Sequence, residues 1–163
     1  MTEPLVSLCV PTRNRAEGLA RGLASTCGQD YGRLEILISD NASDDDTERV
    51  CREMAAEDNR IRYIRQPKNI GLYGNHNFCL DESRGEFICF FHDHDDRDRS
   101  IVSRYVCFMQ EHPTVGVVCS DWNVIDAAGE RIDSRDRKVP AVVPGLEFIT
   151  RTFASGRSSL NTP

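Results

Sequence analysis

The densest cluster of chemically active side chains follows a short apolar run, Ile88–Phe91, and contains Asp93, His94, Asp95 and Asp96. Carboxylates packed together repel one another unless a cation lies between them. Asp93 and Asp95 are two residues apart, so an extended backbone would point both to the same side. This arrangement suits a hard divalent cation that shares oxygens with a diphosphate. A solvated acidic loop before a helix would have the same composition, and the spacing alone leaves both interpretations open.

Histidine and cysteine residues do not form a zinc pattern. His92 and His94 are surrounded by aspartates, so we expect a structural or supporting role for both. The seven cysteines form no CxxC pair and mostly lie in apolar segments. This distribution indicates buried thiols in a reducing compartment rather than a disulfide framework.

Polar residues also follow other apolar segments. Asp40 ends the second such segment, where its carboxylate could hydrogen-bond a base or ribose, or satisfy the backbone of a turn. Arg13 and Arg15 follow the first segment and could contact phosphate or be solvated. We interpret the run 44–46 as charge that complements a helix N-terminus, with Ser43 as the cap. Neither GxGxxG nor GxxxxGK[ST] occurs, which weakens a dinucleotide-binding or P-loop assignment.

These clusters require elements that bring them to one edge of a sheet, because ligands bind beyond the carboxyl ends of parallel strands. Near-continuous apolar runs, typical of strands covered on both faces, alternate with segments of helical spacing. The alternation predicts an α/β fold with three layers, α/β/α, and a mostly parallel sheet, in one domain over residues 1–163. The predicted strands are Leu5–Val10, Leu34–Ser39, Ile61–Ile64, Glu86–His92 and Val115–Ser120, and the pairs Leu19/Leu23, Val50/Met54 and Ile101/Tyr105 mark helices.

The pattern changes after Ser120. Residues 126–129 predict a hairpin turn, and Leu146, Ile149 and Phe153 have the spacing of a short last helix. The final segment, 155–163, shows no completed element, so we expect the natural protein to continue.

Composition narrows the function classes. The chain has 163 residues, and its 39% hydrophobic content supports a packed core rather than disorder. A net charge of −6 argues against a nucleic-acid partner, which would need a basic face. Apolar runs are too short to span a bilayer and the N-terminus does not resemble a secretory signal. We therefore expect a cytoplasmic protein, with peripheral attachment to a membrane as the alternative.

Taken in order, these clusters resemble the nucleotide-binding half of a family 2 glycosyltransferase with the GT-A fold. The resemblance covers about residues 5–125 and rests on four segments, 6–15, 38–47, 69–77 and 85–96. It implies a metal-dependent, inverting transfer of a sugar from a nucleoside diphosphate sugar, commonly UDP-linked, to an acceptor hydroxyl. The acceptor could be a saccharide, a lipid-linked molecule or a natural product.

The resemblance also implies a role for each matching residue. Asp93 and Asp95 are the DxD pair, which would hold Mn²⁺ or Mg²⁺ and the donor diphosphate, with Asp95 in direct contact with the metal. Asp40 would bond the base. The remaining nucleotide-sugar-binding residues would hold the nucleoside or shape the pocket beneath it, and they are Pro11, Thr12, Arg13, Asn69, Gly71 and Asn77.

Two positions depart from the pattern of the family, and one function is unaccounted for. Ser100 stands where many members have proline, and His76 stands where many have arginine, so a phosphate contact from position 76 is in doubt. The catalytic base of such enzymes lies well beyond the DxD pair, and we expect it beyond residue 163. The chain is therefore expected to bind donor without transferring sugar, and apolar surface left uncovered would favour self-association.

Three other functions fit parts of the sequence. A sugar nucleotidyltransferase would need a loop rich in glycine and basic residues after the first strand, and Pro11–Arg15 lacks those glycines. A non-catalytic nucleotide-binding fragment would keep donor binding alone. A receiver-like phosphoacceptor domain would need an acidic pair after the first strand and a lysine after the fifth, and the sequence has neither.

Overall fold

The computed structural model describes residues 3–126, 128–135 and 142–145. The chain divides into two compact units, residues 1–110 and 111–163, which are described separately. The predicted single domain over residues 1–163 stays a prediction.

The first unit is built on a four-stranded, fully parallel sheet in the order β3-β2-β1-β4. The strands are β1 (Val6–Thr12), β2 (Leu34–Asp40), β3 (Ile61–Arg65) and β4 (Phe87–Phe90). These match four of the predicted strands. Asp40 pairs in register with Thr12 on one side and with Arg65 on the other, so the polar residues that end the strands meet at one edge of the sheet.

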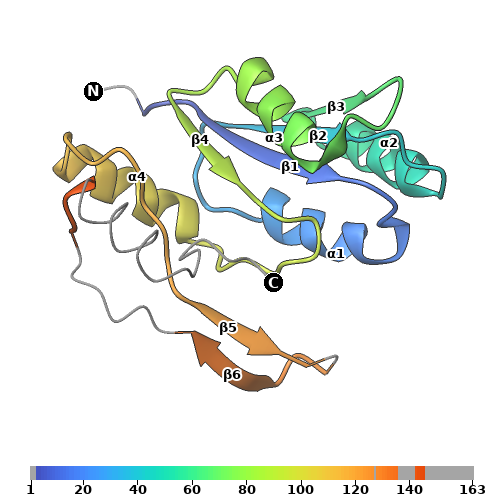
Figure 1. Cartoon of the computed structure of the whole chain (residues 1–163). Coiled ribbons are helices and arrows are strands. Elements are labelled where there is room, and N and C mark those ends of the chain that lie inside the picture. The colour runs from blue at the N-terminus through green and yellow to red at the C-terminus, as the bar shows by residue number, and fades with distance from the viewer. Residues whose placement is uncertain (1–2, 127, 136–141, 146–163) are drawn as a thin grey trace. The chain divides into compact units, whose positions relative to one another are not determined.

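Helices cover both faces of this sheet, as predicted for three layers. Side chains alternate between the faces of a strand, and Leu8 therefore packs with α1 (Ala16–Cys27), α2 (Thr47–Glu57) and α4 (Ile101–Glu111) in one cluster. Its neighbour Cys9 packs on the other face with α3 (Gly71–Glu82). Figure 1 shows α1 and α3 on opposite sides of β1.

The prediction of buried thiols is confirmed for the cysteines of the core only. Cys9, Cys51 and Cys79 are fully buried, whereas Cys107 and Cys119 are exposed. The expectation of buried thiols is therefore wrong for the last two. Their apolar surroundings in the sequence belong to α4 and to a segment that is not a strand, so neither residue is enclosed from both faces of a sheet.

The second unit corrects the last predicted strand. Residues 115–120 form no strand, and Val117 is 75% exposed. Instead, β5 (Trp122–Ile125) pairs antiparallel with β6 (Arg131–Arg135). An apolar run becomes a strand only where a neighbour accepts its backbone hydrogen bonds, and β6 pairs with the segment that follows the run. Residues 121–123 therefore do not end a parallel strand.

The predicted hairpin turn is confirmed, since Asp126 Oδ1 accepts a hydrogen bond from the backbone N–H of Glu130 at 2.9 Å and Gly129 has φ 86°. The helix expected around Leu146, Ile149 and Phe153 lies outside the described residues. Among the residues that the structure does describe, no helix is both long and apolar enough to cross a bilayer.

One half-buried ion pair gives a pH-dependent contribution to stability. Arg60 donates two hydrogen bonds to the Asp58 carboxylate, from Nε to Oδ1 at 3.0 Å and from Nη2 to Oδ2 at 2.6 Å. Its Nη2 also donates to the carbonyl oxygen of Cys27. The hydrogen bonds from Arg60 lower the pKa of Asp58 from 3.8 to about 2. A lowered pKa stabilises the folded state above the unfolded value, so this contribution is present above about pH 4 and is lost as the pH falls toward 2.

We expect Asp58→Asn to lower the free energy of unfolding at pH 7 by about 1–2 kcal/mol and to make it less dependent on pH between 4 and 2. Urea unfolding at pH 7, 4 and 3 measures both effects. Asp46→Asn is the control, because that carboxylate is exposed and its nearest cation, Arg49, is 3.5 Å away. An equal loss at all three values of pH would contradict the ionic origin.

Candidate functional site

The candidate site lies where the chain reverses its direction across the sheet. From β1 it moves outward to β2 and β3, and it then returns to β4 on the other side of β1. Ligands of open α/β sheets bind at such a reversal, beyond the carboxyl ends of the two strands that flank it, here β1 and β4. Thr12 ends β1 at this point, and Asp93 and Asp95 follow β4.

Asp93 is buried and held in place. Its Oδ2 accepts a hydrogen bond from Thr12 Oγ1 at 2.6 Å, and its Oδ1 lies 3.0 Å from His94 Nδ1 and 3.8 Å from Arg15 Nε. Only 8% of the residue is exposed. Asp93 therefore ties the end of β4 to the end of β1, and it has little carboxylate surface left for a ligand.

Asp95 is the more accessible carboxylate of the pair, with a side chain 37% exposed. Arg97 Nη2 donates to Asp95 Oδ2 at 2.9 Å, and Oδ1 lies 3.7 Å from His94 Nε2. The Arg97 guanidinium lies over the ring of Phe91, 4.9 Å from its centre. The Asp95 carboxylate thus interacts with the positive charge of Arg97, as expected for a carboxylate that can bind a cation.

The donor set fits a metal that shares its ligands with a substrate. Within residues 3–126, 128–135 and 142–145, no group of three or more His, Cys, Asp or Glu side chains is arranged to hold a metal ion. Magnesium-type cations often take only one or two carboxylates and complete their shell with phosphate oxygens and water. Asp95, with Asp93 in support, matches that pattern. Burial lowers the pKa of His92, so this half-buried ring favours its neutral form.

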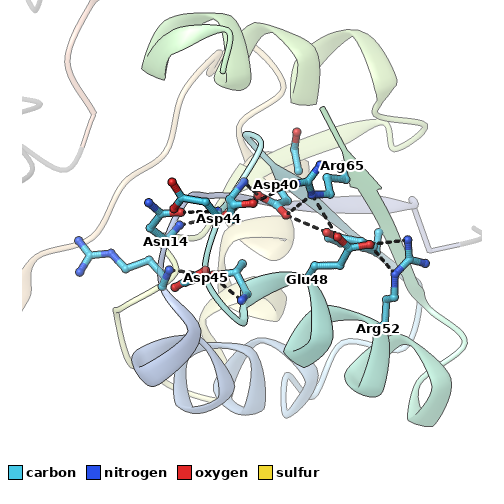
Figure 2. A network of polar contacts seen from close by, with 12 residues as sticks. Asn14, Asp40, Asp44, Asp45, Glu48, Arg52 and Arg65 are labelled. Carbon is cyan, nitrogen blue, oxygen red and sulfur yellow. Dashed lines mark hydrogen bonds and ion pairs between the residues drawn. The ribbon is translucent and has the colours of Figure 1, made fainter. Parts of the chain in front are cut away.

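Asp40 lies at the end of β2 with no exposed surface. Its Oδ1 accepts hydrogen bonds from the N–H and the hydroxyl of Ser43, and its Oδ2 accepts one from Tyr63 at 2.8 Å and lies 3.7 Å from Arg65 Nε. Figure 2 shows Arg65 between Asp40 and Glu48. Asp40 thus shapes the loop that follows β2. Its contact to the base stays a prediction, and that contact would require one of these bonds to open.

The acidic run after Asp40 starts a helix, as predicted, but its cap differs. Ser43 points back to Asp40, and Asp45 Oδ1 instead accepts the N–H of Thr47, the first residue of α2. The other oxygen of Asp45 accepts the N–H of Ala16 at the start of α1. The Ser43 cap was therefore wrong, because a buried carboxylate competes for the serine hydroxyl. Asp45 joins the starts of two helices (Figure 2).

The structure adds Asn41, to which sequence reasoning gave no role. Its Nδ2 donates to Asn69 Oδ1 at 2.8 Å, its Oδ1 accepts the N–H of Ile70, and its own N–H donates to Thr12 O. Gly71 closes this loop with φ 78°, a left-handed conformation that favours glycine. The predicted residues Asn69 and Gly71 are thus brought to the strand ends, and the available signal was the position of Asn41 directly after β2.

The neighbouring asparagines of α3 have opposite environments. Asn75 is buried and exchanges hydrogen bonds with Ser39, at 2.6 Å to its hydroxyl and 2.9 Å to its carbonyl oxygen. The predicted pocket residue Asn77 is exposed. Because the helix begins at Gly71, Asn75 and Cys79 share its buried side, and Asn77 lies two residues off that side.

The loop after β1 also distinguishes two neighbouring arginines. Pro11 is half-buried in β1, and Arg13 is exposed beyond its end. Asn14 then adopts φ 53°, which turns the chain. It is therefore Arg15 that lies beside Asp93, and sequence spacing alone could not separate it from Arg13.

Comparisons with known proteins identify the family of this chain. The family described as Glycosyl transferase family 2 matches residues 7–156. The putative glycosyltransferase EpsE of Bacillus subtilis is 30% identical over 155 residues, which are 94% of this chain and 55% of that protein. The GalNAc(5)-diNAcBac-PP-undecaprenol beta-1,3-glucosyltransferase of Campylobacter jejuni is 40% identical over 94 residues, 57% of this chain and 30% of that protein. The chain thus spans between 30% and 55% of the lengths of these relatives.

Solved structures show the same fold. The mannosyltransferase PcManGT from Pyrobaculum calidifontis, in complex with GDP-Man and Mn²⁺, superposes with a TM-score of 0.65 at 26% identity, over 71% of this chain and 34% of that one. TarS of S. aureus superposes with a TM-score of 0.61 at 25% identity, over 67% of this chain and 20% of that one. The α/β fold of GT-A type implied by the motifs is confirmed, and the chain belongs to glycosyl transferase family 2.

Proposed function

We propose that the whole protein transfers a sugar from a nucleoside diphosphate donor to an acceptor hydroxyl, and that this chain binds the donor. The observation that carries the proposal is the pair of carboxylates that follows β4 beside the end of β1. Asp93 is fixed to Thr12 at 2.6 Å, and Asp95 presents an accessible oxygen beside it. A fixed and an accessible carboxylate at a strand end suit a metal held jointly by protein and diphosphate.

We infer that the donor lies along the strand ends with its diphosphate toward Asp95. Arg15, 54% exposed beside Asp93, could meet a phosphate oxygen. The nucleoside would lie toward Thr12 and the loop after β2. The remaining proposed contacts are those of Pro11, Arg13, Asp40, Asn69, Gly71 and Asn77.

The proposed metal is Mn²⁺ or Mg²⁺, held by Asp95 with Asp93 in support. When bound, it would supply positive charge that stabilises the departing nucleoside diphosphate. The similarity to PcManGT, whose structure contains GDP-Man and Mn²⁺, supports a divalent cation. The nucleoside diphosphate that we propose as the leaving group is UDP. GDP is the alternative, and it is tested in parallel.

The proposed transfer inverts the anomeric carbon in a single displacement. A general base would deprotonate the acceptor hydroxyl while it attacks in line with the leaving diphosphate. We assign this base to no residue of the described chain. The acceptor and the self-association of the chain stay predictions.

We expect UDP to bind the chain at least about tenfold more weakly in EDTA than with Mn²⁺, because the carboxylates repel a diphosphate until a cation intervenes. Titration calorimetry measures both affinities, and GDP is titrated in parallel. Uridine is the control, since it lacks the diphosphate and should bind equally in both buffers. Equal affinity for UDP in both conditions would refute the metal-dependent donor site.

A further inference from the structure

Helix α1 contacts the main chain of Asp93 at a residue that has no side chain. Gly22 is buried in the middle of this helix. A Cβ atom added to Gly22 would lie 2.5 Å from the carbonyl oxygen of Asp93 and 3.0 Å from its carbonyl carbon. Both are main-chain atoms, which cannot rotate away as the end of a side chain can. The main chain of Asp93 therefore lies directly against α1 at the only kind of residue that leaves room for it.

The requirements of the helix itself do not explain this glycine. Glycine is among the poorest residues for a helix interior, because it loses the most backbone freedom on folding. The carbonyl oxygen of Gly22 accepts hydrogen bonds from Ser25 Oγ at 3.0 Å and Thr26 Oγ1 at 2.9 Å, which any residue could accept. Gly18 lies one turn earlier in α1, and a Cβ there would have no atom within 4 Å. The close approach is thus specific to the position beside Asp93.

The approach is one of three restraints on Asp93. The chain just before it is fixed by the hydrogen bond from Phe91 N to Cys9 O at 2.8 Å. Its side chain is fixed by Thr12 at 2.6 Å. Gly22 limits how close its main chain can come to α1. Moving that main chain would strain the Thr12 bond and displace Asp95, two residues further on.

We propose that Gly22 is a positioning residue for metal and diphosphate, because the absence of its side chain sets the depth at which the Asp93 main chain lies. The inference rests on the proposed function. It predicts that a single methyl group, placed on a helix and touching neither ligand, impairs the metal-dependent part of donor binding. Loss of a group that only orients a metal ligand typically costs about 10–100-fold in metal affinity, so a loss of about tenfold is expected here.

The experiment compares Gly22→Ala with Gly18→Ala. UDP is titrated into the parent chain and into each variant, with Mn²⁺ and again with EDTA. We expect Gly22→Ala to lose about tenfold in UDP affinity with Mn²⁺ while its UDP affinity in EDTA stays at the parent value. Gly18→Ala should match the parent in both buffers. A general loss of structure would lower both affinities together, so the ratio between the buffers separates positioning from folding.

A second measurement uses the parent chain and is independent of how well the variant folds. In an amide NMR spectrum, addition of Mg²⁺ and UDP should shift the Gly22 resonance more than that of Gly18. Equal shifts of the two resonances would refute the role of Gly22. So would a folded Gly22→Ala variant whose ratio of UDP affinities, with Mn²⁺ over with EDTA, equals that of the parent. If the UDP affinity of the parent chain does not depend on Mn²⁺, the proposed function is refuted, and this role of Gly22 with it.

Discussion

Asp95→Asn is expected to abolish the metal-dependent part of donor binding, while Asp96→Asn leaves it near the parent value. Asparagine keeps the size of the side chain and removes its charge. The Asp95 side chain is 37% exposed and interacts with the loop residues His94 and Arg97, whereas Asp96 is exposed on the same loop. Residues that only support metal ligands typically cost about 10–100-fold in metal affinity, so loss of the ligand itself should cost at least about 100-fold.

Calorimetry with UDP and Mn²⁺ on both variants tests this expectation. The Asp96 variant removes the same charge one residue away, so it measures the contribution of net negative charge on the loop. Asp93→Asn provides a third value, expected to lie between the other two, because Asn can still accept the hydrogen bond from Thr12. Equal losses for Asp95 and Asp96 would show that the loop acts through its overall charge and would refute a metal ligand at position 95.

Asp40→Ala is expected to have the second largest effect, on stability and on nucleotide binding together. It would leave the hydroxyl of Tyr63 and the N–H of Ser43 without their buried acceptor. Burial, and then the hydrogen bond to Asp40, raise the pKa of Tyr63, so its hydroxyl stays a donor at neutral pH. A buried group left without its hydrogen-bond partner typically costs about 1–3 kcal/mol, and we expect about 3 kcal/mol because two such groups lose their acceptor, while the partly exposed Arg65 retains Glu48 at 3.2 Å.

The matched variant is Asp45→Ala. Asp45 is exposed and accepts two backbone N–H groups at the starts of α1 and α2, so its removal should cost about 1 kcal/mol, as for other helix caps. Urea unfolding at pH 7 compares the two variants, and UDP titration at a temperature where both are folded compares their affinities. The weaker binder should be Asp40→Ala. Similar losses for both variants would mean that the carboxylate at position 40 does not shape the nucleoside side of the site.

The sheet and the location of the site could be predicted because they depend on patterns that are local in sequence. The near-continuous apolar runs identified β1 to β4, and Asp40 and Asp93 followed those runs directly. The carboxyl ends of parallel strands meet at one edge, so the polar clusters had to converge there. The error at residues 115–120 arose because strand formation depends on a pairing partner, and β6 pairs with residues 122–125 instead.

The details of the site could not be predicted because they depend on backbone angles and competing partners. The turn at Asn14, with φ 53°, decides that Arg15 rather than Arg13 lies beside Asp93. The buried face of α3 decides that Asn75 is enclosed and Asn77 is not. The close approach at Gly22 joins residues far apart in sequence, and a lone glycine in a helical pattern gives no indication of what lies against it.

The hydrogen bonds of Asn41 have a consequence for the energetics of recognition. One side chain fastens the loop before α3 to the end of β2, and its backbone fastens β2 to Thr12. The floor beneath the proposed nucleoside is thus held in place by hydrogen bonds within the chain. When a ligand binds a surface that is already held in place, the protein loses little conformational entropy. More of the contact energy then appears as affinity. On this side of the site, selectivity among bases should therefore come from rigid shape rather than from a loop that adapts to each ligand.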